Sequence, residues 1–137
     1  MKLNNLKRMS KNLKEGKDFE IFEGIVATIK PNMSRSHKNN IGLKLNKYIQ
    51  ENEVENNDPS NIPEKDLNEI SYKALIEEVI IDIKGLQNDD GSELEWSEKV
   101  GLEMLRDPDM QFFFDKIITI ASSDDNFFEL DVDTKKK

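Results

Sequence analysis

The segment "DFEIFEGIVATIK", residues 18–30, constrains the fold more than any other part of the sequence. Its apolar residues alternate with other residues on both sides of Glu23-Gly24: first Phe19 and Ile21, then Ile25, Ala27 and Ile29. Alternation with a period of two is typical of half-buried strands, and a Gly-containing pair between two such runs predicts a hairpin. Pro31 ends the second strand because proline cannot donate to a β-ladder. The chain is therefore expected to contain an antiparallel β-hairpin near its N-terminus.

Two long segments have the apolar spacing of amphipathic helices. Residues 36–51 place four apolar side chains on one helical face: Ile41, Leu45, Tyr48 and Ile49. The second segment begins near Pro63, where proline and the acidic residues after it suit the first turn of a helix. Its apolar residues continue to Ile83, and Gly85 is the expected C-terminal stop. The polar residues around Pro59, between the two segments, predict a loop.

Two shorter helices are expected after these. Ser97 is well placed to cap the helix "SEKVGLEMLRD", because its hydroxyl accepts a hydrogen bond from the first turn. Asp107 and Pro108 repeat this start signal for a last helix. One side of that helix is apolar: Met110, Phe114, Ile117, Ile118 and Ala121. The run Phe112 to Phe114 has the composition of a base-stacking platform, but its acidic setting and helical spacing favour packing in the core.

The segment "LQNDDGSELEWS", residues 86–97, raises the question of a calcium loop. In an EF-hand the glycine occupies position six, so Gly91 would place Leu86 at position one and Ser97 at position twelve. Neither residue is the oxygen-rich ligand that these positions need. Asp90-Gly91 is instead a favoured turn pair, because both residues tolerate a positive φ. We interpret the segment as a short β-like turn that binds no essential calcium.

The two ends of the chain carry weaker patterns. Residues 1–16 have Leu3, Leu6 and Leu13 at near-helical spacing, but the apolar stripe is thin, which favours a basic flexible arm. Residues 123–137 lose periodicity and are interpreted as an acidic disordered tail ending in Lys-Lys-Lys. The sequence thus predicts one globular domain over residues 17–122. Its fold class is α+β and mainly α, with an N-terminal β-hairpin, about four helices and a short β-like turn near Asp90-Gly91.

The composition argues against several classes of function. The chain has no cysteine and one histidine, which excludes a Cys-based metal site, a thiol nucleophile, a disulfide framework and a His-rich metal centre. Asp89 and Asp90 are adjacent, with no group placed by the sequence to tune them, so we interpret them as a solvated turn and predict no catalytic, cofactor or metal site. No apolar run approaches the roughly 18 residues that cross a bilayer, and no signal peptide is evident, so a reducing cytoplasm is expected.

The charge is divided unevenly along the chain. Residues 1–17 contain six Lys or Arg residues and one Glu, a net charge of +5, so the remaining residues carry −13, for a total of −8. An acidic body argues against duplex nucleic acid as a ligand, since nucleic acid is bound by basic surfaces. It favours solubility and association with basic partners. His37, close to Arg35 and Lys38, is predicted to lie at the surface.

The order of these elements resembles that of the tail assembly chaperones of long-tailed bacteriophages. The resemblance covers roughly residues 17–130 and includes the hairpin, "NMSRSHKNNIGLKLNKYI", "EMLRDPDMQFFFD" and "IITIASSDDNFF". The most specific part is "DIKGLQNDDGSELEWS", in which the matching residues are Asp82, Gly85, Leu86, Asp89, Gly91, Trp96 and Ser97. Ile83 stands where that family usually has tryptophan, a change that keeps the position apolar.

This resemblance implies an assembly role in the host cytoplasm without catalysis. Such chaperones bind the tape-measure protein, help to recruit tail tube subunits and leave before the tail is complete; self-association is compatible with this role, and neither nucleic acid nor a membrane is an expected partner. We expect apolar grooves on the helices to hold the tape measure, with acidic rims that supply solubility. The family often makes two products by a frameshift near the end of the shorter one, for which the codons of Lys135 to Lys137 are candidates.

Two alternatives from other classes stay open at this point. A virion structural protein of the neck or tail-completion kind could share the pattern of elements. An acidic inhibitor that mimics DNA could share the charge, and would bind a nuclease or DNA-binding protein in a salt-sensitive way.

Overall fold

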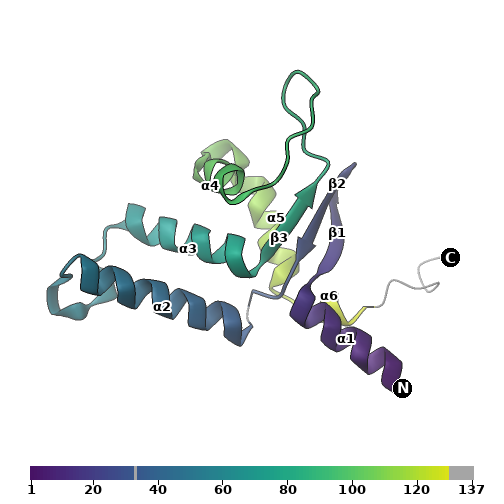
Figure 1. Cartoon of the computed structure of the whole chain (residues 1–137), viewed down its shortest axis with the longest axis horizontal. Helices are drawn as coiled ribbons and strands as arrows, with labels where there is room; N and C mark the ends of the chain where they lie inside the picture. Colours follow the sequence, from purple (N-terminus) through teal and green to yellow (C-terminus); the bar gives the residue numbers. More distant parts are fainter. Residues whose placement is uncertain (33, 130–137) are drawn as a thin grey trace.

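The computed structural model describes residues 1–32 and 34–129, which combine a three-stranded antiparallel sheet with six α-helices (Figure 1). The strands are β1 (Lys17–Phe22), β2 (Ile25–Ile29) and β3 (Ile80–Lys84). The α-helices are α1 (Leu3–Glu15), α2 (Arg35–Glu51), α3 (Glu64–Glu78), α4 (Glu98–Arg106), α5 (Gln111–Ala121) and α6 (Asp125–Phe128). Short 3-10 turns are η1 (Glu55–Asn57), η2 (Pro59–Asn61) and η3 (Pro108–Met110). The predicted class, α+β and mainly α, is confirmed.

The sheet begins with the predicted hairpin. β1 and β2 pair antiparallel, with Phe19 opposite Ala27, and the turn between them lies at Glu23-Gly24. Gly24 has a φ of +81°, a conformation that side-chain-bearing residues rarely adopt. A register shift between Glu20 and Phe22 marks a β-bulge.

The third strand corrects the predicted long helix over residues 63–83. α3 ends at Glu78, and Ile80–Lys84 form β3, which pairs antiparallel with β2 so that Ile83 faces Ala27. The physical reason is the run of β-branched residues at positions 79–81, which fits a pleated surface better than a helix. Gly85 therefore follows a strand and is not a helix stop.

The hydrophobic core lies against one face of the sheet. α5 packs there, with Phe113, Phe114, Ile117 and Ala121 buried, so the predicted apolar side of this helix is present with Phe113 added. The strands contribute Ile21, Ala27, Ile29 and Ile83 to the same core. On the opposite face Thr28 lies across from Asp18, and its hydroxyl donates to an Asp18 carboxylate oxygen at 2.5 Å. Figure 1 shows α5 on one side of the strands, with α2 and α3 as an antiparallel pair beside them.

Leu3–Glu15 form a helix where the sequence predicted a flexible arm over residues 1–16. α1 packs against α6, and the half-buried Leu13 lies against the core. The Asn12 side-chain amide donates to the Phe127 carbonyl at 2.9 Å. This contact left no local pattern in the sequence, because α6 lies more than a hundred positions away from α1 in the chain.

The predicted disordered tail, residues 123–137, is also corrected in its first part. α6 forms at Asp125–Phe128, and Phe127 is fully buried in the core against the ring of Phe19, with the two ring centroids 5.5 Å apart. The Lys17 ammonium donates to the Asn126 carbonyl at 3.5 Å. Residues 130–137, including the lysines considered for a frameshift, lie outside the described residues.

Candidate partner-binding groove

A groove with a volume of about 330 Å³ lies between α3, α4 and α5. Its α3 wall carries Asn68, Tyr72 and Leu75, and its α5 wall carries Gln111, Phe114, Asp115 and Ile118. These positions recur every three or four residues, so each wall is one stripe of its helix. Leu105, Arg106, Asp107 and Pro108 close the groove at the end of α4. We call this the α3–α4–α5 groove.

The floor of the groove is apolar and its rim is charged. Phe114 is 3% exposed, whereas Tyr72, Leu75, Leu105 and Ile118 are half-buried and keep part of their surface open to solvent. Exposed carboxylates stand on the rim at Asp107 and Asp115. An apolar floor with a polar rim is the arrangement that binds the apolar face of a helix.

A bidentate ion pair between Arg106 and Glu69 stabilises one end of the groove. The Arg106 guanidinium donates to the two carboxylate oxygens of Glu69 at 2.8 and 2.5 Å, which joins α4 to α3. These bonds lower the pKa of Glu69 and raise the pKa of Arg106. A second hollow of about 760 Å³ shares Asn68, Tyr72 and Arg106 with the groove and extends it along α3. The accessible trough is therefore longer than the groove alone.

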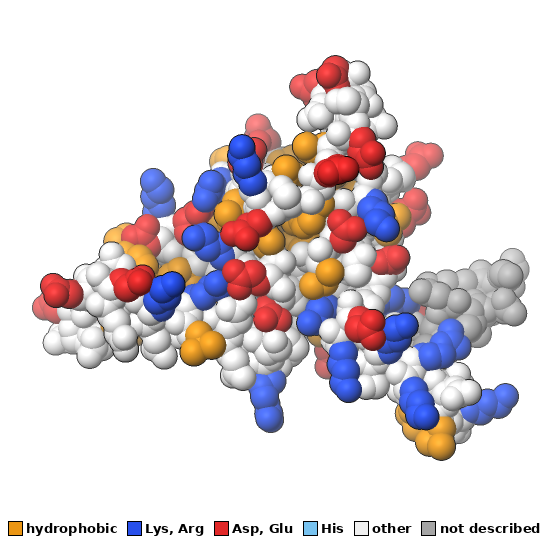
Figure 2. Space-filling view, in the orientation of Figure 1, with side chains coloured by type: hydrophobic (Ala, Val, Ile, Leu, Met, Phe, Trp, Pro, Cys, Tyr) orange, Lys and Arg blue, Asp and Glu red, His pale blue; other side chains and the backbone are white. Residues whose placement is uncertain are grey.

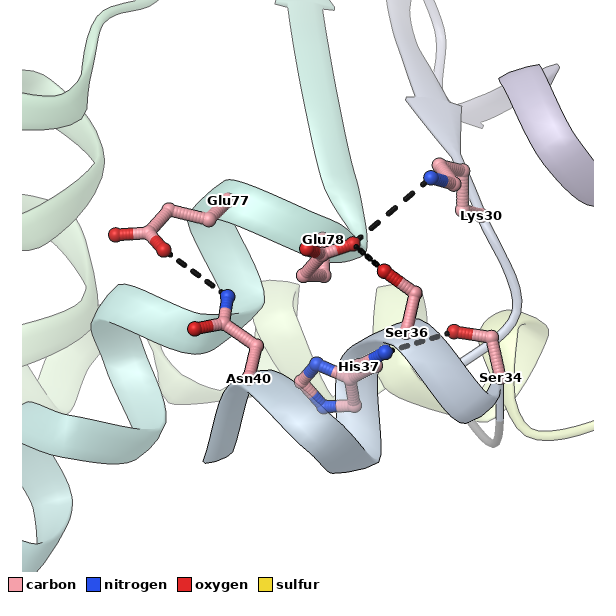
Figure 3. A network of polar contacts seen from close by, with 7 residues as sticks. All are labelled: Lys30, Ser34, Ser36, His37, Asn40, Glu77 and Glu78. Atoms are coloured by element: carbon pink, nitrogen blue, oxygen red, sulfur yellow. Dashed lines mark hydrogen bonds and ion pairs between the residues drawn. The ribbon is translucent and has the colours of Figure 1, made fainter. Parts of the chain in front are cut away.

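A polar network joins the other side of α3 to α2 (Figure 3). Glu78 accepts a hydrogen bond from the Ser36 hydroxyl at 2.8 Å and pairs with the Lys30 ammonium at 3.9 Å. Glu77 accepts from the Asn40 amide and from the Lys44 ammonium, each at 3.0 Å; these bonds lower its pKa. Every carboxylate in this network has a partner, so we assign it to holding the α2–α3 pair.

His37 lies inside this network, which corrects its predicted surface position. Its backbone N–H donates to the Ser34 hydroxyl at 3.1 Å, the N-cap bond of α2. Its side chain is only 6% exposed, and the buried Nδ1 has no hydrogen-bond partner among the described residues. His37 lies four residues before Ile41, so it continues the apolar stripe of α2; this spacing was the signal in the sequence.

Burial lowers the pKa of His37, and the nearby Glu78 carboxylate opposes that effect. Because the unfolded chain then binds a proton more readily than the folded chain, we expect the free energy of unfolding to fall as the pH drops below about 6.5, until it passes the folded-state pKa. His37→Gln should remove this part of the pH dependence. Urea unfolding at several pH values between 5 and 7.5 measures the free energy of unfolding of both proteins. If this free energy changes equally with pH in the two proteins, the prediction is wrong.

The Asp90-Gly91 segment is a turn, as predicted. The Gly91 N–H donates to the Asn88 carbonyl at 2.9 Å, and Gly91 has a φ of +89°. Asp90 accepts from the Ser92 hydroxyl at 2.6 Å and from its N–H at 2.8 Å, and these bonds lower its pKa. In residues 1–32 and 34–129 no group of three or more His, Asp or Glu side chains is arranged to hold a metal ion. The Asp90 carboxylate serves the turn itself.

The aromatic run divides between core and surface. Phe113 and Phe114 are buried, which confirms the packing prediction for these two residues, but Phe112 is 61% exposed. The Phe112 ring lies edge-on to the ring of Phe22, with centroids 5.9 Å apart. The Lys116 ammonium lies over the Phe22 ring, with its Nζ 4.4 Å from the ring centroid.

No helix in the described part of the chain is long and apolar enough to cross a membrane.

A comparison with protein families identifies the origin of the chain. The sequence profile described as "YdaY prophage protein" matches residues 37–137, most of the chain. This chain belongs to the YdaY prophage protein family. The match includes most of α2, all of α3 to α6 and the walls of the α3–α4–α5 groove, so the groove is part of a phage-derived protein. Neither the curated proteins nor the solved structures compared with this chain include a match.

The sequence led us to expect apolar grooves on the helices, but it did not indicate where such a groove would lie. The predicted helix over residues 63–83 made Leu75 one of many apolar positions on an element taken as central, and Tyr72 was not among them. Arg106 gave no signal, because its ion pair with Glu69 depends on how α4 crosses α3. The recurrence of Asn68, Tyr72 and Leu75 at helical spacing was the available clue.

Proposed function

We propose that this chain is a tail assembly chaperone that binds the tape-measure protein of its phage and helps to recruit tail tube subunits. Three features support the proposal: the phage family, the motif resemblance centred on residues 82–97, and the α3–α4–α5 groove. The groove carries most of the argument, because it is a surface suited to a helical apolar segment and involves no catalytic group.

The chemistry of the groove fits a long helical client. Apolar side chains at Tyr72 and Ile118 would cover an apolar stripe of the tape measure, while the carboxylates of Asp107 and Asp115 stay in water at the rim. The overall charge of −8 would keep the complex soluble in the host cytoplasm. A groove of this size gives a weak contact, which suits a chaperone that must leave as tube subunits polymerise.

Co-expression with the tape-measure protein of the same phage tests this function. We expect the chain to raise the soluble fraction of the tape measure several-fold. Ile118→Lys, on the groove wall, should weaken binding by about tenfold or more and so remove most of that gain, because a charge in an apolar contact costs roughly 1.5–3 kcal/mol. Ile81→Lys is the matched control, since Ile81 is 41% exposed on β3, outside the groove.

Both variants should first be shown to melt cooperatively near the wild-type temperature. A tape measure that stays equally insoluble with and without this chain would show that the chaperone function is wrong. Purified phage particles separate the virion alternative: a virion structural protein persists in them, whereas a chaperone is absent.

A further inference from the structure

The apolar face of α1 continues past the part that packs against the protein. Met9 and Leu13 are half-buried, whereas Leu3 and Leu6 are 72% and 49% exposed. These four positions are spaced by three or four residues and lie on one side of the helix. Figure 2 shows hydrophobic side chains at the outer end of α1, beside Lys and Arg side chains. The N-terminal half of α1 therefore presents an uncovered apolar strip, Leu3–Leu6.

The charge around this strip selects the kind of surface that can cover it. α1 and its N-cap carry five basic residues and one acidic residue: Lys2, Lys7, Arg8, Lys11 and Lys14 against Glu15. A second α1 would bring like charges together, so an α1–α1 contact is disfavoured. The complementary surface is an apolar groove with an acidic rim.

The α3–α4–α5 groove of the same chain has those properties. Its floor is apolar and partly open to solvent, and its rim carries Asp107 and Asp115. The one arginine of the rim, Arg106, is already neutralised by Glu69. A short amphipathic helix with basic flanks matches the groove in both shape and charge.

We propose that α1 of one copy binds the α3–α4–α5 groove of a second copy, with the Leu3–Leu6 strip on the apolar floor and the lysines facing the rim. Because the two surfaces differ, the contact is head-to-tail and leaves a free α1 at one end and a free groove at the other. The short helix makes the interface small, so association depends on concentration and is weakened by salt. This contact stands without the proposed function, although a tape-measure segment in the groove would compete with it.

Sedimentation velocity of the untagged protein over a concentration series tests the proposal. We expect species above the monomer mass of 15.9 kDa, and at least about tenfold weaker association when NaCl rises from about 0.05 to 0.5 M. The double variant Leu3→Gln, Leu6→Gln should abolish association, while its control Asn4→Gln on the same helix should not. Asp115→Lys on the rim should also abolish association. Asp89→Lys makes the same charge change in the segment between β3 and α4, which projects from the body in Figure 1, and should not affect association.

Mixing the two defective proteins distinguishes a head-to-tail contact from a symmetric one. The leucine double variant keeps an intact groove, and Asp115→Lys keeps an intact α1, so an equimolar mixture should form a dimer and stop there. A contact between two α1 helices would instead let Asp115→Lys associate with itself and give no complex that contains the leucine double variant, which would overturn the proposal. Association that persists unchanged in both variants would overturn it too, as would a wild-type chain that stays monomeric while α1 binds vesicles of anionic phospholipid.

Discussion

Gly85→Ala is expected to destabilise the protein by about 4 kcal/mol or more, a large effect for a substitution that adds one methyl group. A Cβ at this position would lie 1.9 Å from the Gly24 carbonyl oxygen and 3.2 Å from the Ile25 Cα. Both are backbone atoms of the β1–β2 hairpin, so no side chain can rotate away. Gly85 also has a φ of +96°, which a residue with a Cβ adopts at a cost of roughly 1–2 kcal/mol. The melting temperature should fall by more than about 10 °C.

Gly91→Ala is the matched control for this substitution. Gly91 has nearly the same φ, +89°, but nothing lies within 4 Å of an added Cβ. This variant therefore carries the backbone strain without the clash and should cost roughly 1–2 kcal/mol. Calorimetry of the two variants separates the terms. Equal melting temperatures would show that Gly85 does not contact the hairpin as described.

The pairing of β3 with β2 explains why the local sequence pattern predicted the wrong end for α3. Residues 63–83 have a continuous apolar pattern, which alone fits a buried helix as well as a helix followed by a strand. The choice is made by β2, whose open edge accepts Ile80–Lys84 as a third strand. The hairpin and α2, by contrast, are encoded by local alternation and periodicity, and the sequence predicted both.

The candidate groove shows the same division between local and distant information. Each wall is a local stripe that periodicity reveals, such as Tyr72 and Leu75 on α3 or Phe114 and Ile118 on α5. Which stripes face each other depends on crossings between elements far apart in the chain, and the Arg106–Glu69 ion pair joins residues 37 positions apart. Packing of that kind leaves no short-range pattern, so the groove needed the structure.

Phe127→Ala is expected to cost about 3–5 kcal/mol, because it removes a fully buried ring and leaves a cavity in the core. The ring packs edge-on against Phe19, and the backbone of the same residue accepts the hydrogen bond from Asn12 in α1. Loss of the ring should therefore loosen α1 as well as α6. The melting temperature should fall by about 10 °C or more, and the amides of α1 should exchange faster with solvent.

Phe128→Ala is the control, since the neighbouring ring is 37% exposed. The same atoms are removed, but more than a third of this residue is already open to water, so less buried apolar surface is lost and the cost should stay below about 2 kcal/mol. The comparison tests whether residues 125–128 belong to the folded core or to the disordered tail that the sequence suggested. Equal stabilities of the two variants, together with unchanged amide exchange in α1, would show that residues 125–128 are not part of the folded core. A large difference in stability, with faster amide exchange in α1 of Phe127→Ala, would establish that α6 holds α1 in a fixed position on the protein. The Leu3–Leu6 strip would then be fixed with it.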